Sequence, residues 1–111
     1  MTNLIELITN TLDEKKANDI VVIDFKNSNP LVDAFIVCDA PSLRQVQALS
    51  TDVEEAIIKA GGKIKIQERQ NDASWVLIDA IDVIVHIFIT EERERYNLEK
   101  LYQDYIDDRV L

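Results

Sequence analysis

The apolar residues follow two kinds of spacing along the chain. Three segments repeat an apolar residue every three or four positions, which is typical of helices with one buried face. Five shorter segments are continuously apolar or alternate with period two, which is typical of β-strands. The predicted helices are residues 3–16, 41–62 and 90–105. The predicted strands are residues 20–25, 33–39, 63–69, 75–79 and 82–89.

This order of elements, α-β-β-α-β-β-β-α, predicts one α/β domain over residues 1–111, with a mixed five-stranded sheet and flanking helices. In the second helix, Ser42 is placed to cap the N-terminus. Gly61 and Gly62 are placed to end it, because glycine readily adopts a left-handed backbone. We expect Thr90 to cap the last helix and the last six residues to fray.

The segment "WVLIDAIDVIVHIFI", residues 75–89, is nearly all apolar, yet it contains two aspartates and the only histidine. If Ala80 and Ile81 form a two-residue turn, its strands pair as a hairpin. The predicted pairs are Asp79 with Asp82, Leu77 with Ile84, and Trp75 with His86. Ile81 is β-branched and therefore unsuited to the positive φ of a tight turn. Its presence favours the alternatives of a longer loop or another turn type.

This pairing predicts two different faces for the hairpin. One face is uniformly apolar and should pack on the helices; it consists of Val76, Ile78, Val83, Val85 and Ile87. The other face is a candidate partner-binding surface; it consists of Trp75, Leu77, Asp79, Asp82, Ile84 and His86. Tryptophan is enriched at binding hot spots, although a core role for Trp75 is equally consistent with the pattern. The aspartates fit a surface that meets a basic partner or a turn that is simply solvated.

The charge balance bears on the class of partner. Twelve basic residues against 21 acidic ones give a formal net charge of -9. Proteins that hold nucleic acid directly usually present a basic patch, and no segment here is rich in Lys and Arg, so we expect little direct nucleic-acid binding. A basic protein partner fits better, because complementary fields speed association. The alternative is that the charge only maintains solubility.

Several function classes are disfavoured by composition. The apolar runs are too short to span a membrane, and the first residues match neither a signal peptide nor a transit peptide, so we expect a cytoplasmic protein. The single cysteine, Cys38, excludes an internal disulfide and a cysteine-rich zinc site.

Catalytic and metal-binding interpretations are weak. Cys38 ends an apolar strand, where a buried thiol is more common than a nucleophile. His86 with Asp79 and Asp82 could hold a metal or form an acid–base pair, but no motif with metal-ligand spacing is present. The chain has only two glycines, at a helix end, so no glycine-rich phosphate loop follows a strand. We therefore expect no catalytic residue, cofactor or metal.

Three longer segments carry a family resemblance: "DAFIVCDAPSLRQVQAL" (33–49), "WVLIDAIDVIVHIF" (75–88) and "EERERYNLEKLY" (91–102). In this order and spacing, the chain resembles the ribosomal silencing factor family, also called Iojap-like. The resemblance implies a nucleotidyltransferase-like fold without catalytic residues. Two departures stand out: the family usually has glycine in place of Ile81 and often tryptophan in place of Tyr102.

The resemblance also implies a non-enzymatic function. Family members bind uL14, a basic protein on the intersubunit face of the large ribosomal subunit, and so block joining of the small subunit when nutrients are short. The resemblance places the hairpin residues at or near this ribosomal contact, and it is consistent with a homodimer. Two alternatives remain open: a large-subunit assembly factor, and a nucleotide- or metal-binding enzyme relic of the same fold.

Overall fold

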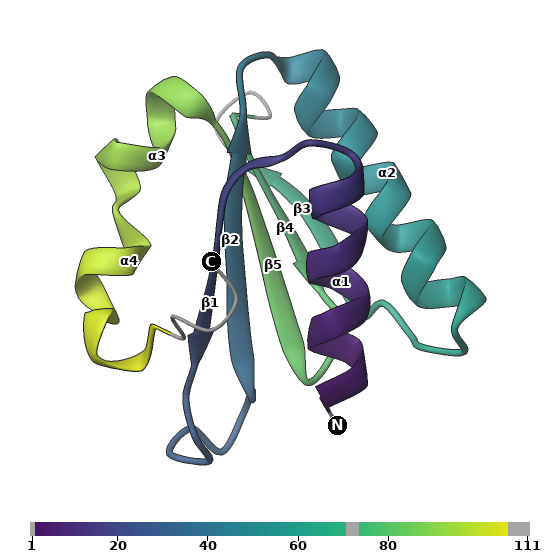
Figure 1. Cartoon of the computed structure of the whole chain (residues 1–111), viewed down its shortest axis with the longest axis vertical. Helices are drawn as coiled ribbons and strands as arrows, with labels where there is room; N and C mark the ends of the chain where they lie inside the picture. The colour runs from purple at the N-terminus through teal and green to yellow at the C-terminus, as the bar shows by residue number, and fades with distance from the viewer. Residues whose placement is uncertain (1, 71–73, 107–111) are drawn as a thin grey trace.

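The computed structural model describes residues 2–70 and 74–106 (Figure 1). Its helices are α1 (Thr2–Glu14), α2 (Leu43–Lys59), α3 (Thr90–Tyr96) and α4 (Leu98–Leu101), followed by a 3-10 turn, η1 (Gln103–Tyr105). Its strands are β1 (Asn18–Asp24), β2 (Ala34–Ala40), β3 (Ile66–Gln70), β4 (Trp75–Asp79) and β5 (Val83–Ile89). The predicted α/β fold with a mixed five-stranded sheet is confirmed.

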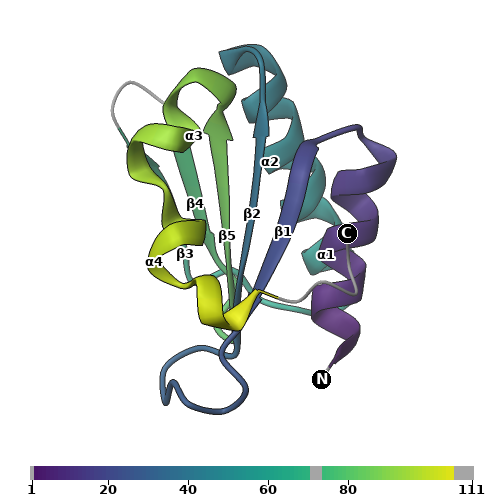
Figure 2. The same cartoon turned by 60° about the vertical axis from the view of Figure 1, so that its left-hand side comes forward.

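The strands lie in the order β1-β2-β5-β4-β3. The β2–β5 pair is parallel and the other three pairs are antiparallel. β2 and β5 are therefore central strands, which explains why both read as nearly continuous apolar runs. α2 begins just after β2, and the chain returns through β3 and β4 before β5 enters beside β2 (Figure 2).

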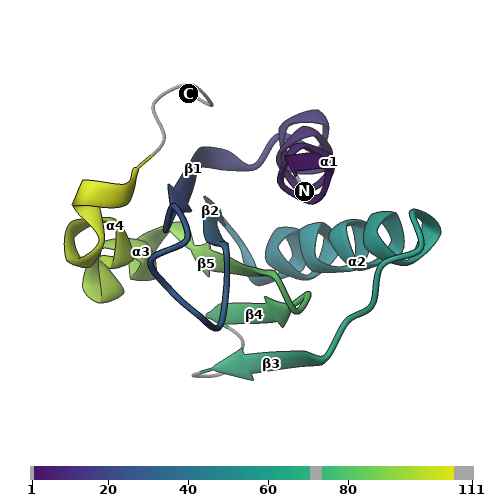
Figure 3. The same ribbon diagram turned by 90° about the horizontal axis from the view of Figure 1, so that it is seen from below.

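The helices cover the two faces of the sheet unequally. α1 and α2 pack on one face and bury the main core, centred on β2, β4 and β5. α3, α4 and η1 lie on the opposite face, near β1, β2 and β5, over a smaller aromatic cluster. Figure 3 shows that this second group does not extend over β3 and β4, so one end of the sheet has a bare face.

The ends of α2 agree with the prediction. The Ser42 hydroxyl accepts a hydrogen bond from the backbone N–H of Gln45 at 3.2 Å, as an N-cap does. Gly61 has φ of +89°, the left-handed conformation that a side chain would strain. The glycine pair therefore stops α2 and turns the chain toward β3.

The last helical segment differs from the prediction in two ways. Thr90 is not the cap of α3: Ile89 occupies that position, and the Thr90 hydroxyl donates to Oδ1 of Asp39 at 2.7 Å. The helix also breaks at Asn97, which has φ of +43° and lies between the end of α3 and the start of α4. Asparagine tolerates this backbone better than most residues. Ile106 bridges to β1, and the residues beyond it, predicted to fray, lie outside the described part.

Candidate functional site

The β4–β5 hairpin pairs two residues away from the predicted register. The observed partners are Trp75 with Phe88, Leu77 with His86, and Asp79 with Ile84. The predicted pairs of Trp75 with His86, Leu77 with Ile84, and Asp79 with Asp82 are therefore wrong. Side chains alternate with period two, so a shift by an even number leaves each strand residue on its predicted face.

The turn explains the shift. Its two central residues are Ile81 and Asp82, because the Ala80 N–H donates to the Val83 carbonyl at 2.9 Å. The Ile81 N–H in turn donates to Oδ1 of Asp79 at 2.8 Å. Asp79 thus helps to close the turn, and Asp82 is exposed at its tip, outside the strands. Asp79 and Asp82 therefore do not face each other as a cross-strand pair.

The turn places Ile81 at φ of +76°, which is unfavourable for a β-branched residue. We expect Ile81→Gly to raise the free energy of unfolding by about 1 kcal/mol. The substitution relieves a backbone strain of about 1–3 kcal/mol in the folded protein. Against this, glycine gives the unfolded chain more conformational freedom, which lowers the free energy of unfolding by about 0.5–1 kcal/mol. Urea titration measures the change. Leu31→Gly is the control, since Leu31 is 82% exposed and has no positive φ; equal stabilisation of both variants would refute the strain.

The face of the hairpin that was predicted to pack on the helices does so. Each of its five residues is at most 2% exposed and belongs to the main core under α1 and α2; they are Val76, Ile78, Val83, Val85 and Ile87. The division of the hairpin into a packed face and a mixed face is thus confirmed, and within the two strands only the mixed face keeps partly exposed side chains apart from Ile89 at the strand end.

Trp75 is half-buried on the mixed face and is held in one position. Its indole Nε1 donates to Nδ1 of His86 at 3.1 Å. Its ring stacks on Phe88, with centroids 5.0 Å apart, and meets Tyr96 at 4.7 Å. A large side chain fixed on three sides can present a flat apolar surface without losing rotamer freedom when it binds.

His86 is not on a partly exposed surface, which corrects the sequence prediction: it is only 4% exposed. Phe35 meets its ring edge-on at 4.7 Å. Burial lowers the pKa of His86 to about 4, so the imidazole is neutral near pH 7. Because Nδ1 accepts the Trp75 N–H, the proton resides on Nε2, for which the described residues provide no partner.

This lowered pKa should make stability fall with acidification. The unfolded histidine, with a pKa near 6.5, takes up a proton before the folded one does. The contribution is fully present above about pH 6.5 and is lost as pH falls toward 4. Between pH 7 and 5 we expect a loss of about 2 kcal/mol from this group. Chemical denaturation of wild type and His86→Leu across this pH range isolates the contribution of His86. Parallel stability–pH profiles for the two proteins would contradict a lowered pKa of His86.

We call the uncovered part of the mixed face the open sheet face; its described side chains are Glu68, Trp75, Leu77, Asp79 and Ile84. Glu68 on β3 is exposed, and the other four are half-buried. The surface therefore combines an aromatic, two aliphatic groups and two carboxylates. This composition suits a protein partner with apolar and basic groups.

Next to this face, a buried ionic network fixes α3 and α4. Nη1 of Arg93 lies 2.8 Å from Oδ2 of Asp39, and its Nε lies 3.1 Å from Oε2 of Glu99. The same Nη1 donates to the Asn18 carbonyl at 3.3 Å. Sequence reasoning missed this network. Asp39 and Arg93 are 54 residues apart, and no local pattern indicates that they pair.

The groups considered for catalysis or metal binding are placed as follows. Cys38 is fully buried in β2; burial raises the pKa of its thiol to about 12, and nearby Arg93 opposes this only partly. Asp82 is in the turn, and Nδ1 of His86 is occupied by Trp75. In the described ranges no three His, Cys, Asp or Glu side chains gather as a metal site. In the same ranges, no helix is both long and apolar enough to cross a membrane.

Comparison with known proteins identifies the family. The model described as "Ribosomal silencing factor during starvation" matches residues 1–110. The chain belongs to this family. A ribosomal silencing factor from Halalkalibacterium halodurans is 41% identical over 101 residues, covering 91% of this chain and 86% of the relative. A mouse relative named mitochondrial assembly of ribosomal large subunit protein 1 is 26% identical over 102 residues, covering 88% of this chain and 44% of its own.

A solved structure shows the same fold as this silencing factor chain. The crystal structure of protein CV0518 from Chromobacterium violaceum superposes with a TM-score of 0.86 at 32% identity. The match covers 92% of this chain and 85% of that one. Family membership thus gives this chain a role as a ribosomal silencing factor.

Proposed function

We propose that this silencing factor binds the large ribosomal subunit through the open sheet face, contacts the basic protein uL14 on the intersubunit side, and blocks joining of the small subunit. Family membership supports a ribosomal partner. The observation that carries the choice of surface is the half-buried Trp75, fixed by His86 and Phe88, at the border between the covered and bare parts of the sheet.

The composition of the open sheet face fits a basic protein. Leu77 and Ile84 add apolar area beside Trp75, and the two carboxylates of this face lie next to them. A fixed aromatic anchor with polar groups around it is the usual anatomy of a binding hot spot. The formal net charge of -9 adds a long-range attraction to a positively charged partner.

The six residues predicted from the sequence take different parts in this proposal. Trp75, Leu77, Asp79 and Ile84 are proposed contacts. His86 is a positioning residue, because it is buried and reaches the surface only through its hydrogen bond to Trp75. Asp82 is left out, because it lies at the tip of the turn and lines a cavity on the other side.

The size of the protein suits a steric block. The described part measures 33 × 32 × 23 Å, so a molecule docked on the joining face of one subunit would hold the other away. No catalytic step is needed, since occupancy alone prevents contact. The family description refers to starvation, which supports repression of translation during nutrient limitation. A cytoplasmic location is part of the proposal.

Sucrose-gradient sedimentation with purified subunits tests the proposal. We expect the protein to travel with the large subunit and not the small one, and to reduce the yield of joined ribosomes. Sedimentation of the free protein in the same gradients shows whether it forms a homodimer. Equal sedimentation with both subunits, or undiminished joining, would contradict the proposal.

Binding should weaken as salt increases. Charges at the rim of such an interface are screened over about 8–10 Å near physiological ionic strength. We expect the dissociation constant to rise several-fold between about 50 and 300 mM potassium chloride, mainly through slower association. Surface plasmon resonance on immobilised large subunits measures both rates. An affinity independent of salt would mean that the net charge of -9 has no part in recognition.

A second candidate function is assembly of the large subunit, which the mouse relative's name favours. The same contact would serve both functions, since each requires only binding. Depletion of the protein in cells separates them. Accumulation of incomplete large subunits during growth indicates assembly, whereas normal subunits with excessive joining during starvation indicate silencing.

A further inference from the structure

A cavity of about 550 Å³ lies on the face of the sheet opposite Trp75, where α1 and the end of α2 meet the beginnings of β2 and β5. We propose that it binds a small organic cation with an aliphatic body. Cavities of roughly 300–1,000 Å³ are the usual size for small-molecule sites. This site is separate from the open sheet face and does not depend on the proposed ribosomal contact.

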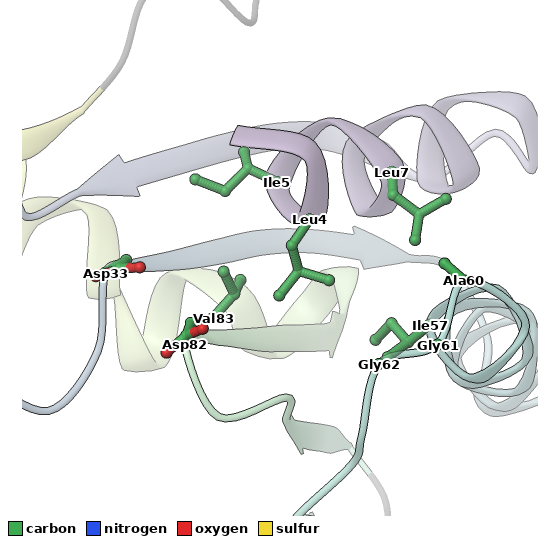
Figure 4. Close-up of a pocket in the computed structure, with 10 residues that line it drawn as sticks. All are labelled: Leu4, Ile5, Leu7, Asp33, Ile57, Ala60, Gly61, Gly62, Asp82 and Val83. Carbon is green, nitrogen blue, oxygen red and sulfur yellow. The ribbon is translucent and has the colours of Figure 1, made fainter. Parts of the chain in front are cut away.

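The shape of the cavity follows from how α2 ends. Gly61 contributes backbone only, and a side chain added there would meet no atom within 4 Å. At Gly62, by contrast, there is no room for a side chain, since an added Cβ would come within 2.8 Å of the Ile57 side chain. The glycine pair that terminates α2 thus also leaves one wall of the cavity without side chains (Figure 4).

The lining specifies an aliphatic body for the ligand. Leu4 and Leu7 enter from α1, Ile57 from α2 and Val83 from β5. Figure 4 shows these side chains directed into the space between the two helices and the strands. A flexible chain of a few methylene groups would gain hydrophobic contact on all of these sides.

The charges specify the head group. Asp33 and Asp82 lie together at one end of the cavity, where the Asp33 N–H donates to the Asp82 carbonyl at 2.7 Å and holds the two segments together (Figure 4). Both residues are exposed, and no described residue pairs with either carboxylate. The described lining contains no Lys or Arg. The C-terminal end of α2 brings a partial negative charge and the first turn of α1 a partial positive one, and the two oppose each other. The two carboxylates therefore decide the preference for a cation.

Titration of ¹⁵N-labelled full-length protein with hexylammonium, hexanoate and hexan-1-ol tests the inference. We expect hexylammonium to shift the amide signals of Gly61, Gly62 and Val83 along a saturable curve. Hexanol should bind more weakly, and hexanoate should not bind. Equal affinity for hexanoate and hexylammonium, or no saturable shift with hexylammonium, would overturn the proposal.

Two pairs of variants localise the binding. Neutralising both carboxylates in Asp33→Asn/Asp82→Asn should weaken hexylammonium binding roughly four- to twenty-fivefold, since each exposed pair contributes about two- to fivefold. Asp13→Asn/Asp104→Asn changes the net charge equally at exposed positions away from the cavity and should have no effect. An equal loss in both double variants would overturn the proposal.

A filling variant provides the steric test. Ala60 lines the cavity at the end opposite the carboxylates, so Ala60→Phe should abolish hexylammonium binding. Ala48→Phe places the same ring on an exposed position of α2 that does not line the cavity, and binding should persist. Both proteins should still sediment with large subunits, so failure here and failure of the ribosomal proposal are distinguishable. Unchanged binding by Ala60→Phe would overturn the proposed site.

Discussion

Arg93→Met should lower the free energy of unfolding by about 3–5 kcal/mol, because removal of one partner from a buried ionic network leaves the other charges uncompensated. The Arg93 side chain is only 8% exposed and that of Asp39 4%. Without the guanidinium, the Thr90 hydroxyl is the one hydrogen-bond donor that the described side chains still offer to the Asp39 carboxylate. We expect α3 and α4 to detach from the end of β2 before the rest of the chain unfolds.

Urea denaturation followed by circular dichroism measures this effect. Arg95→Met is the matched control on the same helix, since the Arg95 side chain is 75% exposed and its one ion-pair partner within residues 2–70 and 74–106 is Glu92 at 3.3 Å. It should change stability by less than about 1 kcal/mol. Addition of Asp39→Asn to Arg93→Met should recover part of the loss, because the uncompensated charge is gone. Similar small losses for both arginine variants would contradict a structural role for the network.

Trp75→Ala should weaken binding to the large subunit by about 2–4 kcal/mol, or roughly thirtyfold to a thousandfold, as truncation of a central aromatic anchor does. The structure adds a second consequence that the sequence did not indicate. Trp75 packs on Phe88 and Tyr96 and satisfies His86, so its removal should also lower stability by about 1–3 kcal/mol. Binding must therefore be expressed per folded molecule.

Two further variants separate anchoring from stability. Tyr105→Ala truncates another half-buried aromatic, which packs on Phe25 at 5.4 Å away from the open sheet face. It should reduce stability while leaving subunit affinity unchanged. Trp75→Phe keeps part of the stacking area, loses the hydrogen bond to His86 and should bind with intermediate affinity. If Tyr105→Ala impairs affinity as strongly as Trp75→Ala, the proposed contact surface is wrong.

The hairpin shows how far pattern reasoning can reach. Alternation alone divided residues 75–89 into two faces, and the packed face lies in the core as predicted. The register depends on which two residues occupy the turn, and neither candidate pair has favourable turn chemistry. Contacts distant in sequence accompany the observed choice: the Asp33 N–H bonds to the Asp82 carbonyl at the tip of the turn. Such a contact leaves no mark in the local pattern.

The burial of His86 shows a different limit. Its face was predicted correctly, because period-two alternation fixes that property. Whether a side chain on that face meets water depends on what covers it. Here Phe35 on β2 and Trp75 on β4 enclose the ring, and the lowered pKa follows from that enclosure. The sequence could not place these rings around the histidine before the strand order was known.

The sequence by itself determined where the helices and strands lie, apart from the helix break at Asn97, and it determined the mixed α/β class, the two faces of the hairpin and the family. These features depend on local periodicity and on motifs in fixed order. The tertiary structure alone decided the strand order, the hairpin register and the pairing of Arg93 with Asp39. It also decided that the face of β3 and β4 on the side of α3 and α4 stays bare. These features arise from contacts between distant segments. Their energies depend on burial and on mutual geometry, which a linear pattern does not encode.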